Sequence, residues 1–111
     1  MECMVYAKQR WLETTSKPYQ SSGGNYSAQS LYNNWKGKKG TTMPDGDLPA
    51  LALWNHNGGA GHTGIVEHKD GYKFFYSDHN GLDGGNGGYG SFIGTSQEIK
   101  NLFKNFIGFC W

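Results

Sequence analysis

Apolar residues recur with helical spacing in three segments of the chain. Segment 3–12 shows the spacing i, i+3, i+7 among good helix formers, and a second such segment follows the N-cap residue Ser27 and ends at Gly37. The third follows Thr95 and Glu98, which fit a capping box. We predict a helix in each segment. The apolar positions that define these helices are Met4, Ala7, Trp11, Ala28, Leu31, Tyr32, Trp35, Ile99, Leu102, Phe103 and Phe106.

Other stretches have the character of strands. Segment 48–54 is an apolar run of strand length, and Pro49 is compatible with the beginning or the edge of a strand. Segment 61–80 contains two apolar-rich runs separated by the short turn 69–71, which predicts a β-hairpin. Residues 107–111 are expected to form a closing strand.

Glycine dominates the part of the chain that follows the hairpin. Segment 81–90 contains six glycines, so we expect a long mobile loop there, and Phe92 and Ile93 form at most a short strand. Helices that precede strands joined by a tight hairpin indicate an α+β domain, with the helices on one side of an antiparallel sheet. At 111 residues, one such domain accounts for residues 1–111.

The loop of the hairpin decides which residues face each other. A three-residue loop, 69–71, closed by Gly71 with a positive φ angle, places Glu67 opposite Lys73. A two-residue loop would place Glu67 opposite Phe74 instead. We favour the three-residue loop because it creates a cross-strand pair of opposite charge, worth about 0.2–1 kcal/mol.

The same register brings polar side chains with catalytic chemistry together. It places His62 opposite Asp78, and Asn80 shares their face because side chains alternate along a strand. The alternative register would place His62 opposite His79. An imidazole beside a carboxylate and a carboxamide is an orientable general base.

Cys3 is the candidate nucleophile that such a base would serve. It falls in the first turn of the predicted N-terminal helix, where unpaired N–H groups and the helix dipole lower the pKa of a thiol. A cysteine, a histidine and an acid or amide form the residue set of Cys–His nucleophilic catalysis. The alternatives are that Cys3 is a buried, inert residue or that it forms a disulfide with Cys110.

Composition and charge narrow the class of protein. The net charge is +1, so no strong attraction to nucleic acids or acidic membranes is expected. No stretch approaches the roughly 20 apolar residues of a membrane span, and we expect no signal peptide. Aromatic residues make up 15% of the chain, and beside glycine and asparagine they suit flat polar ligands such as sugars or glycine-rich peptides.

Four stretches form an ordered set of motifs. They are Cys3–Ala7, a cysteine followed by apolar and aromatic residues; Pro44–Leu48, a Pro-Asp-Gly-Asp-Leu turn; Gly61–Val66, the run Gly-His-Thr-Gly-Ile-Val; and Ser77–Gly81, the run Ser-Asp-His-Asn-Gly. Together with the ending Phe106–Phe109, they resemble the CHAP domains. These are the cysteine- and histidine-dependent amidohydrolases/peptidases of phage endolysins and bacterial cell-wall hydrolases. The resemblance spans essentially the whole chain.

The resemblance implies a papain-like fold, with N-terminal helices packed on a central antiparallel β-sheet, and hydrolysis of an amide bond in peptidoglycan through a thioacyl-enzyme. It implies that Cys3 is the nucleophile, His62 the base, Asp78 the partner of the histidine and Asn80 an assisting residue. The enzyme would be an N-acetylmuramoyl-L-alanine amidase or an endopeptidase of the stem or cross-bridge peptide. Its partners would be bacterial peptidoglycan and other lysin domains or chains, in a phage-encoded or a secreted setting.

The sequence departs from the family's pattern at its start. Glu2 stands where the family usually has Gln, and the polar segment that precedes this position in the family is not present. Some members bind calcium through acidic residues just upstream of the cysteine, so we expect no calcium there and no other cofactor. The backbone N–H of Cys3 is the one oxyanion donor that we can name.

Metal binding is a rival interpretation of the same residues. Zinc would need His56, His62 and His68, but His68 lies about 20 Å from His62 along an extended strand. Calcium favours oxygen ligands at short spacing, but the spacing here matches no standard calcium loop, so we predict no metal site. The oxygen-bearing side chains considered for calcium are Asp78, Asn80, Asp83 and Asn86.

Two further interpretations concern function. One is a non-catalytic module that binds cell-wall glycan or peptide through Trp54, Tyr76, Tyr89 and the glycine-rich loop. The other is a toxin-type amidase delivered between bacteria, which uses the same chemistry in another setting. A thiol reagent separates catalyst from binding module, because a catalytic thiolate reacts fast at neutral pH and a buried structural thiol does not.

Overall fold

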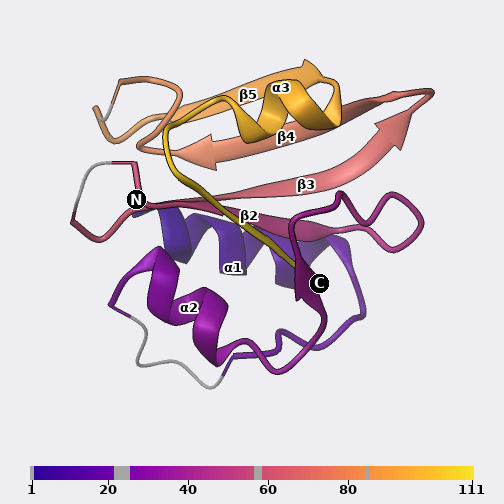
Figure 1. Cartoon of the computed structure of the whole chain (residues 1–111), viewed down its shortest axis with the longest axis horizontal. Coiled ribbons are helices and arrows are strands. Elements are labelled where there is room, and N and C mark those ends of the chain that lie inside the picture. The colour runs from indigo at the N-terminus through magenta and orange to yellow at the C-terminus, as the bar shows by residue number, and fades with distance from the viewer. Residues whose placement is uncertain (1, 22–25, 57–58, 85) are drawn as a thin grey trace.

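The computed structural model describes residues 2–21, 26–56, 59–84 and 86–111. In chain order, the elements in Figure 1 are α1 (Cys3–Thr14), α2 (Ala28–Asn34), β1 (Lys39–Gly40), β2 (Ala50–Trp54), β3 (His62–Asp70), β4 (Lys73–His79), β5 (Tyr89–Gly94), α3 (Ser96–Lys100) and β6 (Phe106–Cys110). The described strands form one antiparallel sheet with the order β1-β6-β2-β3-β4-β5. The predicted α+β class is therefore confirmed.

Strand β2 lies inside the sheet and is buried along its whole length, from Ala50 to Trp54. A strand that is covered on both faces needs apolar residues at every position, which is why this run does not alternate with polar residues. Pro49 stands just before the strand, where its missing N–H removes no ladder hydrogen bond. The predicted strand is correct, although it begins at Ala50 rather than at Leu48.

The first two helices form where the sequence predicts them. Ser27 is the N-cap of α2, and its hydroxyl accepts a hydrogen bond from the backbone N–H of Ser30 at 3.0 Å. The helix ends at Asn34, earlier than the predicted stop at Gly37. Trp35 leaves the helix in an extended conformation and packs into the core, which determines where the chain turns away.

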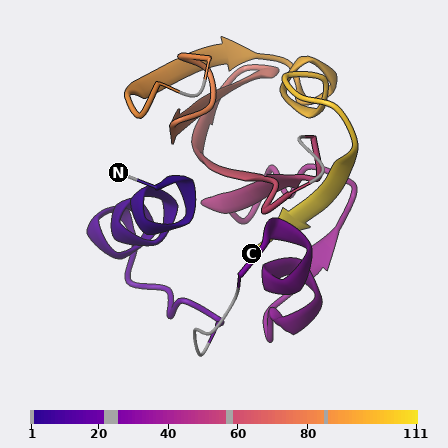
Figure 2. The same ribbon diagram turned by 90° about the vertical axis from the view of Figure 1, so that its left-hand side faces the viewer.

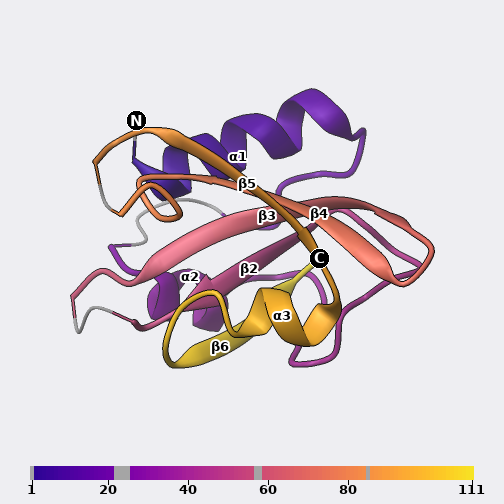
Figure 3. The ribbon, with the colours of Figure 1, turned by 90° about the horizontal axis from the view of Figure 1, so that it is seen from above.

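The sheet is strongly curved (Figure 2). It carries an apolar cluster on each face. Helices α1 and α2 belong to one cluster, in which Trp11 and Leu31 pack with Leu51 and Ile65, and α1 runs beside β3 and β4 (Figure 3). Helix α3 contributes Ile99 to the cluster on the other face. The helices therefore do not all lie on one side. The connection from edge strand β5 to β6 must cross the sheet, and α3 lies in that connection.

The third helix is much shorter than predicted. It begins behind the predicted capping box, in which Thr95 and Glu98 bond reciprocally, but it ends at Lys100 instead of continuing to Phe106. Asn105 takes a left-handed backbone conformation (φ 59°), and Phe106 then begins β6. The pairing of β6 with β2 thus outweighs the local helical pattern.

The glycine-rich segment is more ordered at its end than predicted. Strand β5 starts at Tyr89 and continues to Gly94, so the expectation of a short strand at most was wrong. Its ladder with β4, from the Phe74–Gly94 pair to the His79–Tyr89 pair, supplies the order that a glycine-rich sequence lacks on its own. The two-residue strand β1 pairs with β6 and had no signal in the sequence.

The hairpin forms, but its predicted register was wrong. Asp70 pairs with Lys73 and His68 with Phe75, so the loop consists of Gly71 and the residue after it. Gly71 has the predicted positive φ angle (66°), in the first loop position, as in a type II′ turn. A two-residue loop that begins at Gly71 matches the twist of the strands. The expected pairing of Glu67 with Lys73 does not occur, because Asp70 is the acidic partner of Lys73 in the ladder.

A β-bulge at Glu67 interrupts the ladder between β3 and β4. Continued unchanged from the loop, the pairing would put Val66 opposite Ser77. The extra residue shifts the ladder by one position, so Val66 instead pairs with Tyr76. A shift of one residue exchanges the two faces of a strand, so the bulge determines that Asp78, rather than its neighbours, shares the face of His62.

The bulge residue is held from outside the sheet by helix α1. Arg10 forms a two-pronged ion pair with Glu67, in which Nε contacts Oε1 and Nη2 contacts Oε2 at 3.1 Å. The Glu67 side chain is only 8% exposed, so its carboxylate has little water to replace this partner. We infer that the Arg10–Glu67 pair stabilises the bulge, and with it the register of the hairpin.

Replacing Arg10 with Met should lower the free energy of unfolding by about 1–3 kcal/mol, because the nearly buried Glu67 carboxylate loses its partner. The double variant Arg10→Met/Glu67→Gln should recover most of this loss, and urea denaturation measures both. Lys17→Met is the control, since it removes an exposed ion pair with Asp47 and should cost less than about 1 kcal/mol. An Arg10→Met effect no larger than that of the control would contradict our account of the bulge.

Candidate active site

His62 and Asp78 form a buried hydrogen-bonded pair on one face of the sheet. His62 Nε2 lies 2.8 Å from Asp78 Oδ2, and the two residues are 2% and 0% exposed. Tyr76 donates its hydroxyl hydrogen to the same oxygen at 2.7 Å, and the backbone N–H of Leu82 donates to Oδ1 at 3.3 Å. The prediction that His62 and Asp78 share a face is confirmed, even though they are not directly opposite each other.

Cys3 reaches this pair from the first turn of α1. Its half-buried thiol lines the same pocket as His62, and it lies close enough to His62 and to the backbone N–H groups of Thr63 and Met4 for them to stabilise a thiolate. Because Asp78 occupies Nε2 of the imidazole, the ring nitrogen left for the thiol is Nδ1. Neither cysteine is in a disulfide, and Cys110 is fully buried in the core, so the predicted alternative of a Cys3–Cys110 bond does not occur.

The electrostatics of the site favour a thiolate beside an imidazolium. Burial alone would raise the pKa of Cys3, but the hydrogen bond and charge of His62 and the two backbone N–H groups outweigh it and lower that pKa. Burial alone would lower the pKa of His62, but the hydrogen bonds to Asp78 and Cys3 outweigh it and raise the value to about 9. Each group thus stabilises the charged form of the other.

Aromatic rings shield the imidazole of His62 from water. The indole of Trp54 stacks on it with ring centroids 6.0 Å apart and an interplanar angle of 27°. Phe103 lies edge-on at 4.7 Å, and His56 contacts both His62 and Phe103. A water-poor environment strengthens the hydrogen bond between His62 and Asp78.

Two glycines make this packing possible. A Cβ atom on Gly81 would lie 2.2 Å from His62 Nε2 and 2.5 Å from Asp78 Oδ2, so the backbone of this residue covers the hydrogen bond directly. A Cβ atom on Gly64 would lie 2.2 Å from the ring of Tyr76. The absence of a side chain at Gly64 therefore lets Tyr76 lie across β3 and reach Asp78.

Asn80 lies near the other site residues but makes different contacts. It lines a pocket of about 390 Å³ together with Cys3, His62 and Gly81. Its backbone is left-handed (φ 61°), and its carboxamide oxygen accepts from the N–H of Gly87 at 2.8 Å. The side chain therefore holds the loop between β4 and β5, and Asp78 alone provides the carboxylate on the imidazole. The assisting role expected for Asn80 stays a prediction.

Several residues of the site were not identified from the sequence. The period-two alternation that links His62 to Asp78 also puts Tyr76 on their face, so this signal was available. No local pattern marks Gly81 or Phe103, because each reaches the imidazole through the tertiary fold. The side chains of Tyr76 and Phe103 and the backbone of Gly81 surround the His62–Asp78 pair from three different segments of the chain.

The rival metal and binding interpretations gain no support from these contacts. In the described ranges, no three His, Cys, Asp or Glu side chains form a group that could hold a metal ion. Asp83 uses its carboxylate on the backbone N–H groups of Asn86 and Gly88. Trp54 and Tyr76 are fully buried, so they do not offer a surface on which a ligand could stack, whereas Tyr89, the third aromatic residue of that interpretation, is exposed.

Replacing Gly81 with Ala should separate His62 from Asp78, because the new Cβ atom would occupy their hydrogen bond. We expect the rate of Cys3 alkylation by iodoacetamide at pH 7 to fall by at least about tenfold. Gly46→Ala is the matched control, since a Cβ atom there meets nothing within 4 Å and should leave the rate unchanged. Equal rates in the two variants would mean that the site tolerates the added methyl group.

The rate of Cys3 alkylation should depend on pH in a way that reports the ion pair. With the pKa of Cys3 lowered and that of His62 at about 9, labelling should stay fast well below the ordinary thiol range. Asp78→Asn removes the charge that holds the proton on His62, so its labelling should require pH values near 8.5. Cys110 is an internal reference, because burial raises its pKa to about 12. Superimposable pH profiles for wild type and Asp78→Asn would argue against the ion pair.

Comparisons with known proteins identify no relative of this chain. No family model, no curated protein and no solved structure matches the chain. An interpretation of the site therefore rests on two things, which are the motif resemblance to the CHAP domains and the geometry that brings Cys3, His62 and Asp78 together.

Proposed function

We propose that the chain is a thiol-dependent amide hydrolase that acts on bacterial peptidoglycan. The observation that carries the proposal is the arrangement of the Cys3 thiol beside His62, which is hydrogen-bonded to the buried Asp78, at a pocket that Cys3 and His62 both line. A thiol at the start of a helix, an imidazole and a carboxylate are what nucleophilic attack on an acyl group requires. The resemblance to CHAP domains supports an amide of peptidoglycan as the acyl group.

The chemical steps follow from the proton positions in the site. The Cys3 thiolate attacks the carbonyl carbon of the amide and forms a carbon–sulfur bond, which leaves a negative charge on the oxygen. The imidazolium of His62 then gives its proton to the departing amine as the carbon–nitrogen bond breaks. Water attacks the resulting thioester, His62 takes a proton from that water, and the carbon–sulfur bond breaks to release the acid. Asp78 keeps the imidazole oriented throughout and stabilises its protonated form before the first proton transfer and after the second.

The start of α1 supplies positive potential for the oxyanion. The first hydrogen bond within the helix region runs from the Tyr6 N–H to the Glu2 carbonyl, so the N–H of Cys3 has no partner of this kind. Unpaired N–H groups and the helix dipole favour a negative charge at this end of α1. We propose the backbone N–H of Cys3 as one oxyanion donor.

Several contacts support a papain-like arrangement within residues 1–111 as one CHAP-like catalytic domain. The helix that carries the thiol packs against an antiparallel sheet, and the sheet supplies the histidine and the acid from adjacent strands. The site thus combines the start of the chain with its central hairpin, with Cys3 on α1 and His62 and Asp78 on β3 and β4.

The proposed setting is a bacterial cell wall, reached by a phage-encoded or a secreted enzyme. The bond would lie between muramic acid and L-alanine or within the stem or cross-bridge peptides, and other lysin domains or chains would be further partners. A toxin-type amidase would use the same residues. None of the helices in the described ranges has the length and apolar character that crossing a bilayer demands.

The direct test is turbidity clearing of purified cell walls, with mass spectrometry of the released fragments. The chain should clear the walls, and Cys3→Ala should abolish clearing while leaving the fold intact, because the nucleophile is lost. Cys110→Ala is the control, since it removes the other thiol, which is buried in the core on β6 and does not line the pocket of Cys3. Equal behaviour of the wild-type and Cys3→Ala proteins, with walls bound by both, would reject hydrolysis and favour a binding module.

A further inference from the structure

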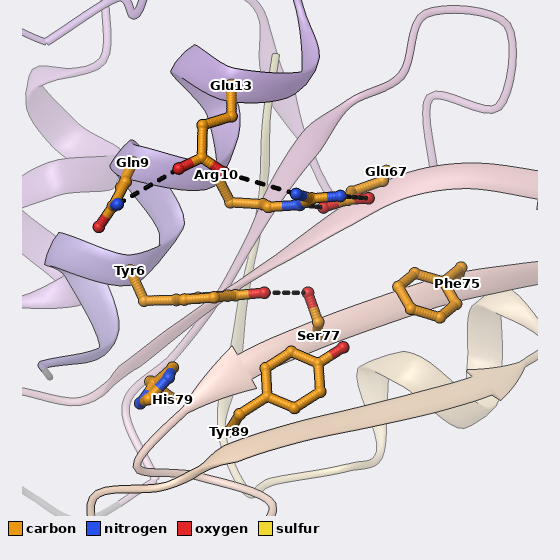
Figure 4. A pocket seen from close by; sticks show the side chains of 9 residues that line it. All are labelled: Tyr6, Gln9, Arg10, Glu13, Glu67, Phe75, Ser77, His79 and Tyr89. Atoms are coloured by element: carbon orange, nitrogen blue, oxygen red, sulfur yellow. Dashed lines mark hydrogen bonds and ion pairs between the residues drawn. The ribbon is translucent and has the colours of Figure 1, made fainter.

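A second hollow lies on the opposite face of β4 from Asp78. It is a groove of about 430 Å³ between α1 and the strands β4 and β5 (Figure 4). Tyr6 of α1 forms one wall, and His79 and Tyr89 from neighbouring strands form the other. The proposed reaction of Cys3, His62 and Asp78 does not involve these side chains, so the groove needs a separate explanation.

The groove and the pocket of the nucleophile both border helix α1. Cys3, Tyr6, Arg10 and Glu13 follow the spacing i, i+3, i+7, i+10, so they form one stripe along α1. On the strand side, His79 lines the groove and the next residue in the chain lines the pocket of Cys3. At about 1.5 Å per residue, the stripe extends roughly 15 Å from the thiol, which is the length of four to five extended residues.

The end of the groove near the thiol is an aromatic trough. The ring of Tyr6 lies 4.9 Å from that of His79 at an interplanar angle of 43°, and 6.0 Å from that of Tyr89 at 68°. Rings inclined to one another do not form the flat platform on which a sugar ring stacks. They suit an aliphatic side chain or the edge of a peptide. The Tyr6 hydroxyl is already bonded to Ser77 at 2.8 Å, so it is held in place.

The far end of the groove carries an excess of negative charge. The guanidinium of Arg10 faces two carboxylates, and its two-pronged pair with Glu67 uses Nε and Nη2, two of the five N–H donors. Glu13 is left with a 3.5 Å contact to Arg10 and a neutral hydrogen bond from Gln9 at 3.2 Å. Its side chain is 52% exposed, so it remains open to a cation from solution.

We propose that this groove binds the peptide part of the substrate, and that its Glu13 end takes a free primary ammonium group of that peptide. The proposal rests on the proposed function, because it assumes a chain whose scissile amide lies at Cys3. A peptide with an apolar side chain near the cleaved bond and an amine four to five residues away matches the trough, the charge and the length. The stem and bridge peptides of peptidoglycan belong to this chemical class.

The test measures binding without cleavage. The Cys3→Ala protein is sedimented with purified walls whose stem peptides carry free ε-amines, and with the same walls after N-acetylation by acetic anhydride. Acetylation should weaken binding about three- to fivefold, as expected for a half-exposed ion pair. Adding Glu13→Gln should weaken binding to untreated walls by the same factor and abolish the effect of acetylation. Asp45 is an exposed carboxylate outside the groove. Asp45→Asn should therefore change neither the binding to untreated walls nor the loss of binding caused by acetylation.

A second variant tests the aromatic trough. Tyr89→Ala should weaken binding to untreated and acetylated walls equally, because its contact is apolar. It should not affect binding to glycan strands from which the peptides have been removed. If Tyr89→Ala weakens binding to those bare strands, the groove holds the sugar chain and the proposal is overturned. It is also overturned if Glu13→Gln keeps full sensitivity to acetylation.

Clearing by the protein with Cys3 intact separates this proposal from the proposed function. Binding that depends on Glu13 without any clearing would reject hydrolysis and retain the groove. Clearing abolished by Cys3→Ala, with binding unaffected by Glu13→Gln, would retain hydrolysis and reject the groove. Failure both to bind and to clear would reject the two together.

Discussion

One extra residue in strand β3 determines whether the candidate site exists. Without the bulge at Glu67, the ladder that starts at the loop would bring the wrong face of β4 to His62, and Asp78 would point away from it. The bulge residue is nearly buried and depends on Arg10 of α1 for a counter-charge. Helix α1 therefore has two roles. Its Arg10 supports the register of the hairpin, and its first turn carries Cys3, which lies beside His62 of that hairpin.

A buried carboxylate then organises the chemistry of the site. Asp78 has no contact with water, so its charge is balanced by His62 and by hydrogen bonds from Tyr76 and a backbone N–H. Such a group is stable only if its partners approach closely. Gly64 and Gly81 allow this approach, because a side chain at either position would overlap Tyr76 or the His62–Asp78 pair.

Features that depend on nearby residues were predictable from the sequence alone. The start of α2 at Ser27 and the capping box at Thr95 follow from hydrogen bonds within a few residues. The placement of Cys3 in a first turn follows from the helical spacing of the apolar residues in α1. The common face of His62 and Asp78 was also predicted correctly. The assumed register was displaced by an even number of residues, and such a displacement leaves the faces of a strand unchanged.

Features that depend on distant partners required the tertiary structure. The bulge at Glu67 needs Arg10, which is 57 residues away in the chain, and the early end of α3 results from the pairing of β6 with β2. The contacts of Gly81 and Asn80 depend on how the loop folds over the site. The sequence by itself determined which residue types meet in α1 and the hairpin, because periodicity and capping are local. Only the tertiary structure decided the register of the hairpin and the close approach of the Gly81 backbone to His62 and Asp78. Several arrangements satisfy the local sequence equally well, and long-range packing and buried charge select one of them.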